Sequence, residues 1–495
     1  MGVVIRQGLK STAVQYLGVI VGAVSNLLLV TQLEAEYGLV VILIASANLV
    51  APFAMMGSYG IAVRYFPYFQ DNSSDRKGFL TLVLGIATVG CVIYLALSPW
   101  IQDVLIEPRF ADTDESMHIY MRYVPILTVL FVFTRVLVQY ISNLRRIVIP
   151  NLLEQFAFKL TLPALLALYL FDLIPLAYIV YGVLIHYALV LLGLVVYLAS
   201  LGGLGLGKVT ADIWAKRKAM SGFAAYGIAG QLGGMLAFRS DVFMVGAYLG
   251  LAAAGKYALA LFLAEIIAKP FSNLRAVVGP MVASAWQRQD FAELQSLYRK
   301  SSDNLMLAAL YLFGGIWVCF DSVAQLASKP STMLEVVGVF FFLGLARVVD
   351  SATSINEHLI TYSPRYRFNL WAILLLAGLN LGMNAWLIPQ LGVVGAALAT
   401  LTSISLYNAL KVGFAFRAFS LWPFGKTSLL IAVIGLAAIA AVYFLPQTEV
   451  WWIDILSRGG LLTVCFYLLV WYGRPSPEAR SLVAKVLRGV GFNVT

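Results

Sequence analysis

Eight basic residues of this chain lie inside or at the ends of long apolar segments instead of in its basic loops. They are Arg122, Arg135, Lys159, Arg239, Lys256, Lys269, Arg275 and Arg347. A cation at bilayer depth is costly, so it persists where it faces the interior of a helix bundle or a water-filled cavity and meets a partner. One arginine can bind two phosphate oxygens at once through parallel N–H donors, and lysine acts as a point charge. A cavity lined by such residues would therefore bind an anion.

Acidic residues are fewer in the same segments, so we expect a net cationic interior. They are Glu154, Asp241, Glu265, Asp350 and Glu357, and we expect them to serve in ion coupling or in pairing with the cations. The residues expected to bind the anionic substrate are Arg135, Lys159, Lys269, Arg275 and Arg347. Arg122 and Lys256 lie close to the expected outer interface and are predicted to anchor helix ends, whereas the role of Arg239 stays open.

The apolar segment 332–362 carries the clearest polar pattern. One face of a helix there would hold Arg347, Asp350, Ser354, Glu357 and Thr361. Arg347 and Asp350 are three residues apart, so they can pair within that helix. Two interpretations remain open: the stripe lines a cavity, or a salt bridge locks this helix to a neighbour.

The segment 255–284 repeats this theme. Glu265, Lys269 and Ser272 share a helix face beside Pro270, which removes a backbone donor and can kink the helix. Arg275 lies about one turn nearer the cytoplasm. It either lines the same cavity or extends its charge to the lipid headgroups.

Nothing in the sequence points to catalysis. The three histidines and the three cysteines show no ligand spacing, so we predict no metal site, no cofactor and no catalytic residue. The outer loop near 100–118 contains Asp112, Asp114 and Glu115, which are interpreted as solvated loop charges.

The elements that hold these residues follow from composition. The chain has 495 residues, of which 61% are hydrophobic and only 12% are charged, well below the roughly 25% of soluble domains. Apolar stretches of the ~20 residues needed to cross a bilayer recur from end to end. The sequence therefore predicts an all-α, polytopic membrane protein.

Apolar runs and polar breaks give about fourteen transmembrane helices. Their expected ranges are 10–32, 38–66, 79–99, 119–142, 151–171, 174–198, 219–249, 255–284, 303–320, 332–362, 369–388, 393–413, 427–445 and 457–473. The first run is too long for a signal peptide and lacks an A-x-A site, so we expect a retained helix.

Loop charges predict the orientation, because Lys and Arg accumulate on the cytoplasmic side of membrane proteins. One alternating set of loops holds most basic residues, among them Lys77, Arg217 and Lys411, and the opposite set holds only Arg109, Lys329 and Arg458. Both termini are then cytoplasmic. The net charge of +10 is mostly this topology signal, so no nucleic acid partner is expected.

An internal repeat divides the chain. The segments 33–43 and 251–261 look like the same tight turn, each followed by a long helix with an internal proline, Pro52 or Pro270. This match favours two long helices over three short ones in 219–285. Four parts are predicted. They are an N-terminal lobe of helices 1–6 at residues 1–199, a basic linker at 200–218, a C-terminal lobe of helices 7–12 at 219–415, and helices 13–14 with the tail at 416–495.

Four segments in this order resemble a known family, namely 5–29, 59–69, 239–250 and 378–403. The chain is similar to the multidrug/oligosaccharidyl-lipid/polysaccharide (MOP) exporter superfamily, and within it to bacterial lipid-linked oligosaccharide flippases of O-antigen (lipopolysaccharide) and exopolysaccharide pathways. The resemblance implies a MATE-like fold of two pseudo-symmetric six-helix lobes with two extra C-terminal helices, and alternating access.

The resemblance also implies a function. We expect a flippase, not an enzyme, that moves undecaprenyl-pyrophosphate-linked glycan from the inner to the outer leaflet of the bacterial inner membrane. Expected partners are this glycan and membrane lipid, with H⁺ or Na⁺ and polysaccharide polymerase and assembly proteins as further candidates. The protein itself is expected to be a monomer. Two alternatives stay open: a multidrug or metabolite antiporter of the same fold, and a membrane glycan polymerase.

Overall fold

The computed structural model describes residues 17–473 apart from 71, 104–118, 145 and 147, and apart from the side chains of 155, 226, 272, 273 and 275–277. Within these residues the regular structure is helical, with no strand. This confirms the all-α prediction. The chain forms two compact units, Met1–Ala258 and Leu259–Thr495. The lobe boundaries expected from the sequence stay a prediction.

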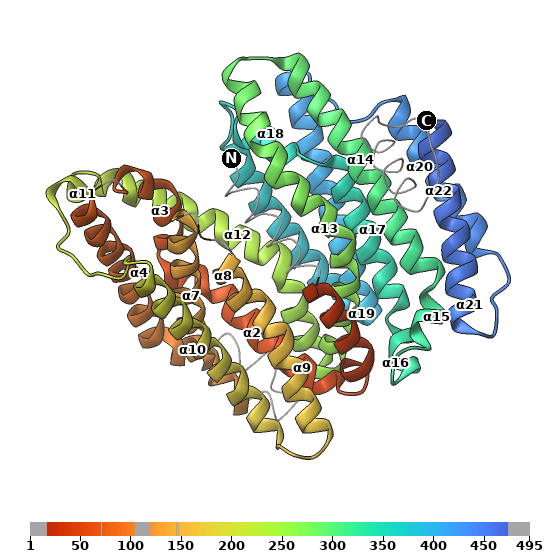
Figure 1. The fold of residues 1–495 in the computed structure, drawn as a ribbon, viewed down its shortest axis with the longest axis horizontal. Helices are drawn as coiled ribbons and strands as arrows, with labels where there is room; N and C mark the ends of the chain where they lie inside the picture. Colours follow the sequence, from red (N-terminus) through yellow and green to blue (C-terminus); the bar gives the residue numbers. More distant parts are fainter. Residues whose placement is uncertain (1–16, 71, 104–118, 145, 147, 474–495) are drawn as a thin grey trace. The chain divides into compact units, whose positions relative to one another are not determined.

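In the first unit α7 (Val124–Asn143) lies among α2 (Glu34–Met55), α4 (Ser73–Ile101) and α10 (Leu176–Ser200), and packs against all three (Figure 1). The other elements are η1 (Asn26–Val30), α3 (Ser58–Tyr65), η2 (Phe66–Tyr68), α8 (Val148–Asn151), η4 (Leu152–Phe156), α9 (Ala157–Leu170), α11 (Ala211–Ala215), α12 (Arg217–Leu249) and the first two turns of α13 (Leu251–Gln287). The core of this unit includes Phe79, Val132, Tyr140 and Leu194.

In the second unit α17 (Val337–Thr353) packs against α14 (Phe291–Val318) and α19 (Phe368–Phe419). The other elements are the rest of α13, α15 (Phe320–Ala324), α16 (Pro330–Glu335), α18 (Asn356–Thr361), α20 (Lys426–Tyr443), α21 (Trp451–Asp454), η5 (Ile455–Gly459) and α22 (Gly460–Gly473). Gly392, at φ 60° and ψ −140°, divides α19 into two helical parts.

Two predictions about helix continuity have different outcomes. The stretch 219–285 is two long helices, as expected, separated at Gly250 with φ 86°. The continuous helix expected over 332–362 is wrong. Ser354 has φ 54°, so α17 ends at Thr353 and α18 begins at Asn356. The five polar residues of that segment therefore do not share one helix face.

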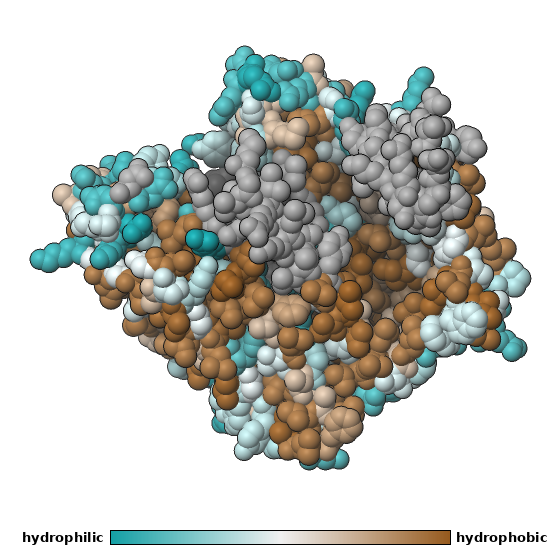
Figure 2. All heavy atoms as spheres, viewed as in Figure 1, coloured by the Kyte–Doolittle hydropathy of each residue, from teal (hydrophilic) through white to brown (hydrophobic). Residues whose placement is uncertain are grey.

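Nine helices of the described chain are long and apolar enough to cross a membrane, and α19 counts once among them despite its break. This supports a multi-pass membrane protein, while the number fourteen stays a prediction. Hydrophobic residues cover much of the visible flanks of the helices (Figure 2). Hydrophilic residues gather at the end of the first unit that carries α11 and α3.

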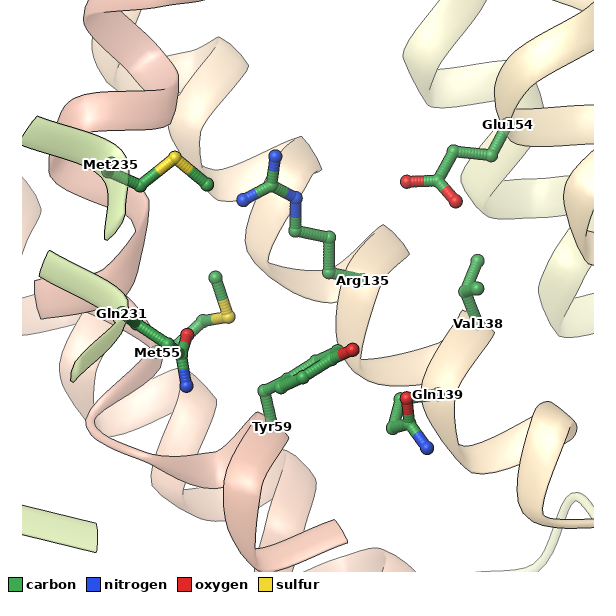
Figure 3. A pocket seen from close by; sticks show the side chains of 8 residues that line it. All are labelled: Met55, Tyr59, Arg135, Val138, Gln139, Glu154, Gln231 and Met235. Carbon is green, nitrogen blue, oxygen red and sulfur yellow. The ribbon is translucent and has the colours of Figure 1, made fainter. Parts of the chain in front are cut away.

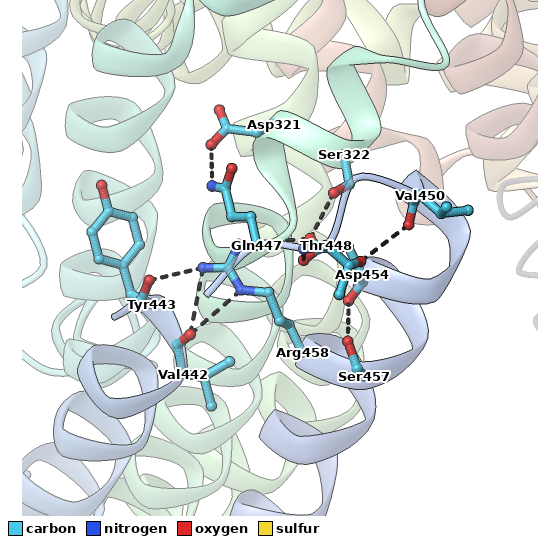
Figure 4. Close-up of polar contacts among 10 residues, drawn as sticks. All are labelled: Asp321, Ser322, Val442, Tyr443, Gln447, Thr448, Val450, Asp454, Ser457 and Arg458. Carbon is cyan, nitrogen blue, oxygen red and sulfur yellow. Dashed lines mark hydrogen bonds and ion pairs between the residues drawn. The ribbon is translucent and has the colours of Figure 1, made fainter. Parts of the chain in front are cut away.

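A buried ion pair ties the C-terminal helices together (Figure 4). Arg458 donates to the carbonyl of Tyr443 at 2.9 Å and lies 3.6 Å from the Asp454 carboxylate. Asp454 also accepts from the Ser322 hydroxyl at 2.6 Å and from the backbone N–H of Thr448 at 3.1 Å. Since Asp454 is 0% and Arg458 3% exposed, these contacts replace the water that both charges lose.

Candidate functional site

A cavity of about 320 Å³ lies inside the first unit (Figure 3). It is lined by Met55, Tyr59, Arg135, Val138, Gln139, Glu154, Gln231 and Met235, which come from α2, α3, α7, η4 and α12. Arg135 and Glu154 extend into it from different helices. The cavity therefore combines one cation, one acid, two amides and a phenol.

A second, smaller cavity of about 150 Å³ shares Arg135 and Glu154 with the first. Its other lining residues are Ile44, Asn48, Phe131, Thr134 and Tyr187. On α7, positions 131, 134, 135, 138 and 139 follow the three- and four-residue spacing of one helix face. This face of α7 thus positions Arg135 where it reaches both spaces.

Arg135 keeps most of its hydrogen-bonding capacity. One guanidinium nitrogen donates to the side-chain oxygen of Asn48, and the guanidinium carbon lies 5.8 Å from the centre of the Phe131 ring. No ion pair joins Arg135 to any residue that the structure describes. Because a guanidinium has five N–H donors and a permanent charge, donors remain for a ligand in the cavity.

Glu154 faces the same space from an unusual helix turn. Leu152–Phe156 is a π-helical turn between α8 and α9, and such turns are frequent at functional sites. Within the described residues the Glu154 carboxylate has no hydrogen bond and no ion pair as close as 4 Å. The acid is therefore near Arg135 without being bound to it.

Lys159 lies elsewhere in the first unit. It lines neither cavity and packs on the helical segment 17–25 that precedes η1, where a Cβ added to Gly18 would be 2.9 Å from the Lys159 ammonium. Of the two substrate-binding residues expected in this unit, the described cavities include Arg135 alone.

In the second unit Arg347 donates to the Glu265 carboxylate at 2.6 Å, between α17 and α13. This is a salt bridge to a neighbouring helix, one of the two interpretations that the sequence left open, and the described residues show no ion pair between Arg347 and Asp350. Asp350 instead accepts from the Asn408 amide at 3.0 Å. Each charge therefore has a partner on another helix, on α13 for Arg347 and on α19 for Asp350. Lys269 is partly buried on α13, and the side chain of Arg275 lies outside the described residues.

The remaining expected residues have the following environments. Asp241 is buried and accepts from the Tyr257 hydroxyl at 2.6 Å and from the backbone N–H of Val242 at 2.8 Å. Glu357 is partly buried in the first turn of α18, and Arg239 is exposed. Arg122 is exposed over the Tyr123 ring, and Lys256 lies 3.5 Å from Glu34, as suits residues that hold helix ends.

Several polar residues of the site were missed from the sequence. Asn48, Gln139 and Gln231 are amides within apolar helices, and their polar character there is the signal that would have found them. Lys411 was counted among the loop cations; the loop assignment is wrong, and its cytoplasmic side stays a prediction. It lies in α19, is 1% exposed and donates to the Tyr407 hydroxyl at 3.0 Å, because α19 continues to Phe419.

A model of the family described as polysaccharide biosynthesis protein matches residues 33–328, well over half of the chain. This chain belongs to the polysaccharide biosynthesis protein family. No curated protein matches it in sequence.

Solved structures similar to this family member share its fold. The lipid II flippase MurJ in an inward closed conformation matches with a TM-score of 0.71 and 13% identity over 94% of this chain and 99% of that chain. An inward-facing multidrug resistance MATE transporter of the MOP superfamily matches with a TM-score of 0.62 and 13% identity over 83% and 98%. A MOP superfamily transporter from Pyrococcus furiosus matches with a TM-score of 0.51 and 13% identity over 89% of this chain and 96% of that chain. The MATE-like fold expected from the resemblance is confirmed.

Proposed function

We propose that this protein is a flippase that moves an undecaprenyl-pyrophosphate-linked oligosaccharide from the cytoplasmic to the outer leaflet of the bacterial inner membrane for surface polysaccharide synthesis, O-antigen among the candidates. The observation that carries this proposal is Arg135, a cation with no acidic partner within 4 Å among the described residues, in a cavity of a membrane helix bundle that also holds amide and phenol groups. Membership of the polysaccharide biosynthesis family and a fold shared with a lipid II flippase support it.

The chemistry of the cavity suits a phosphate next to sugars. Arg135 offers parallel N–H donors to phosphate oxygens, and in a low-dielectric space such charge-assisted bonds are strong. Gln139, Gln231 and Tyr59 offer both donors and acceptors, which match sugar hydroxyls. A space of about 320 Å³ holds a headgroup portion and not a whole glycan, so the distal sugars stay outside and are weakly selected.

The other expected cations enter the proposal as contributors from both units. Lys159, Lys269, Arg275 and Arg347 would contact the headgroup at other stages of an alternating-access cycle, with no covalent step. The ion pair of Arg347 with Glu265 would then exchange for a pyrophosphate. Membrane lipid surrounds the prenyl chain, and polymerase and assembly proteins would receive the product.

Coupling to H⁺ or Na⁺ is the second part of the proposal. Glu154 is the acid best placed for it, because its carboxylate shares both cavities with Arg135 and has no bound partner among the described residues. A carboxylate that alternates between an ion and Arg135 would link substrate release to ion entry. Asp241 is less suited, because Tyr257 and its own backbone already bind it.

A multidrug antiporter of the same fold is the second candidate, since Glu154 could bind an organic cation. The adjacent Arg135 disfavours this by repulsion of a second positive charge.

The test uses purified protein in liposomes with a fluorescent prenyl-pyrophosphate oligosaccharide. Loss of one charged hydrogen-bonding group is expected to slow transfer between leaflets about 10- to 100-fold in Arg135→Ala. Arg122→Ala, a matched change of an exposed arginine, should keep the wild-type rate. In Glu154→Gln, the response of the rate to imposed pH or sodium gradients should disappear. Wild-type transfer by Arg135→Ala would contradict the proposed cavity, and export of an organic cation by the same liposomes would favour the antiporter.

A further inference from the structure

A second pocket in the first unit has a different character. It has a volume of about 350 Å³ and lies among α3, α4, α11 and α12, at the hydrophilic end of this unit (Figures 1 and 2). Most of its wall is apolar, as at Ile61, Ile86 and Ile228, and the polar lining is restricted to Trp214, Arg217 and Ser221. An apolar space with polar groups on a few side chains fits an amphiphile.

The segment before α12 builds one wall of this pocket. Ile213 of α11 is 0% exposed and packs on α4. The preceding glycine-rich stretch lies against the start of α4, where the backbone N–H of Gly207 donates to the Thr81 hydroxyl at 3.0 Å. A Cβ on Gly78 would be 2.4 Å from the Lys208 carbonyl oxygen, so only glycine permits this contact. The wall is thus a packed part of the unit.

Three cations near the pocket have aromatic partners, and no acidic partner among the described residues. The Arg217 guanidinium lies 5.3 Å from the Trp214 ring centre and donates to the Trp214 carbonyl at 3.0 Å. Lys216 lies 4.6 Å from the ring centre of Tyr68, and Arg64 lies 4.7 Å from that of Phe223. None of the three has an ion pair within the part of the chain that the structure describes. Their positive charges are therefore available to an anion.

This pocket is separate from the cavity that contains Arg135. Met55 lines that cavity, whereas the next residue, Met56, lines the apolar pocket. The two side chains diverge because Met56 and Gly57 have φ values of 47° and 78° at the end of α2. A Cβ on Gly57 would be only 2.6 Å from the Cβ of Ala224, so Ala224 packs directly on the backbone of this turn.

We propose that this pocket binds an anionic phospholipid of the cytoplasmic leaflet, with an acyl chain among the isoleucines and the phosphate at Arg217, which lines the pocket. The apolar wall matches the chain, and the unpaired cations match the phosphate. Basic residues on aromatic rings at a membrane surface attract anionic lipid, and the predicted orientation puts this loop on the cytoplasmic side. The lipid would hold α11 and the start of α12 on the bundle, and this role is independent of the transported substrate.

Quenching of Trp214 by brominated lipids tests the proposal in full-length protein reconstituted into phosphatidylcholine vesicles. Trp214 lines the pocket and is 57% exposed. Its own fluorescence is obtained as the difference between the wild-type protein and Trp214→Phe. Brominated phosphatidylglycerol should reach half of its maximal quenching at about one-fifth of the mole fraction required for brominated phosphatidylcholine, the ratio expected for one basic contact.

Variants assign the effect to the pocket. Arg217→Gln should abolish the preference for phosphatidylglycerol, whereas the matched control Lys218→Gln should keep it, because the exposed Lys218 does not line the pocket. Ala225→Phe, at an exposed lining position, should fill the space and reduce quenching by both lipids. Equal quenching by the two lipids, or an unchanged preference in Arg217→Gln, would overturn the proposal. Relief of quenching by a few mole per cent of prenyl-pyrophosphate oligosaccharide would also overturn it, since the pocket would then belong to the substrate.

Discussion

Buried charges of this protein follow two different rules. Arg458 and Asp454 satisfy each other and nearby backbone groups in a fully enclosed network, which is the pattern of a structural pair. Arg135 and Glu154 share two cavities without a direct bond, which leaves both groups able to change partners. At the scale of the residue, the state of pairing distinguishes a charge that holds the fold from a charge that can bind a ligand.

The enclosed pair yields a stability prediction. Arg458→Met should destabilise the second unit by about 3–5 kcal/mol, because Asp454 would stay buried without its cation. The double variant Asp454→Asn with Arg458→Met should lose less free energy of unfolding than the sum of the losses in the two single variants. Thermal unfolding midpoints of the purified protein measure both effects.

Arg288→Met is the control in the same unit, since its pair with Glu293 is exposed and is expected to contribute less than about 1 kcal/mol. Equal shifts for Arg458→Met and Arg288→Met would mean that the buried network does not hold the C-terminal helices.

At the scale of elements, helix ends that meet through glycine shape the first unit. A Cβ on Gly38 of α2 would lie 1.9 Å from the Leu251 carbonyl oxygen, and a Cβ on Gly255 of α13 would lie 1.9 Å from the Glu34 carbonyl oxygen. The two contacts are reciprocal, and each glycine is the fifth residue of its helix. The repeat seen in the sequence at 33–43 and 251–261 thus corresponds to two helix starts that cross backbone to backbone.

This crossing predicts an intolerance to a single methyl group. Gly38→Ala should destabilise the protein by about 1–3 kcal/mol through overpacking, and Gly255→Ala by a similar amount. Thermal unfolding in detergent would measure the loss. Gly85→Ala is the matched control on α4, because nothing lies within 4 Å of its added Cβ. A Gly38→Ala protein as stable as Gly85→Ala would show that the helix starts can separate at no cost.

At the scale of the whole molecule, the family and the long apolar helices describe a multi-pass membrane protein, and the proposed orientation rests on loop charge. Single cysteines in a cysteine-free background test that orientation. Glu449→Cys should react with a membrane-impermeant maleimide in intact cells, and Gln289→Cys only after permeabilisation. Both positions are exposed, so accessibility decides the outcome. The reverse labelling pattern would invert the proposed topology and place the lipid-binding loop outside.

Composition, apolar run length and loop charge determined the class of this protein, its helical character and the presence of cations within its membrane segments. Those properties are local, because hydrophobic length and helical periodicity are read within one segment. The two long helices of 219–285 also followed from a local repeat. The family resemblance added the superfamily and its fold.

Only the tertiary structure decided which of these groups meet. Asn48 and Arg135 are 87 residues apart, and Arg347 and Glu265 are 82 apart, so helix packing and not sequence spacing makes them partners. The breaks at Ser354 and Met56 depend on backbone angles that no residue type there demands, and the break at Ser354 separates residues that the sequence pattern had assigned to one helix face. A cavity is the space that several distant helices leave between them, and this is why Arg135 could be identified from the sequence as a buried cation, whereas its two cavities could not.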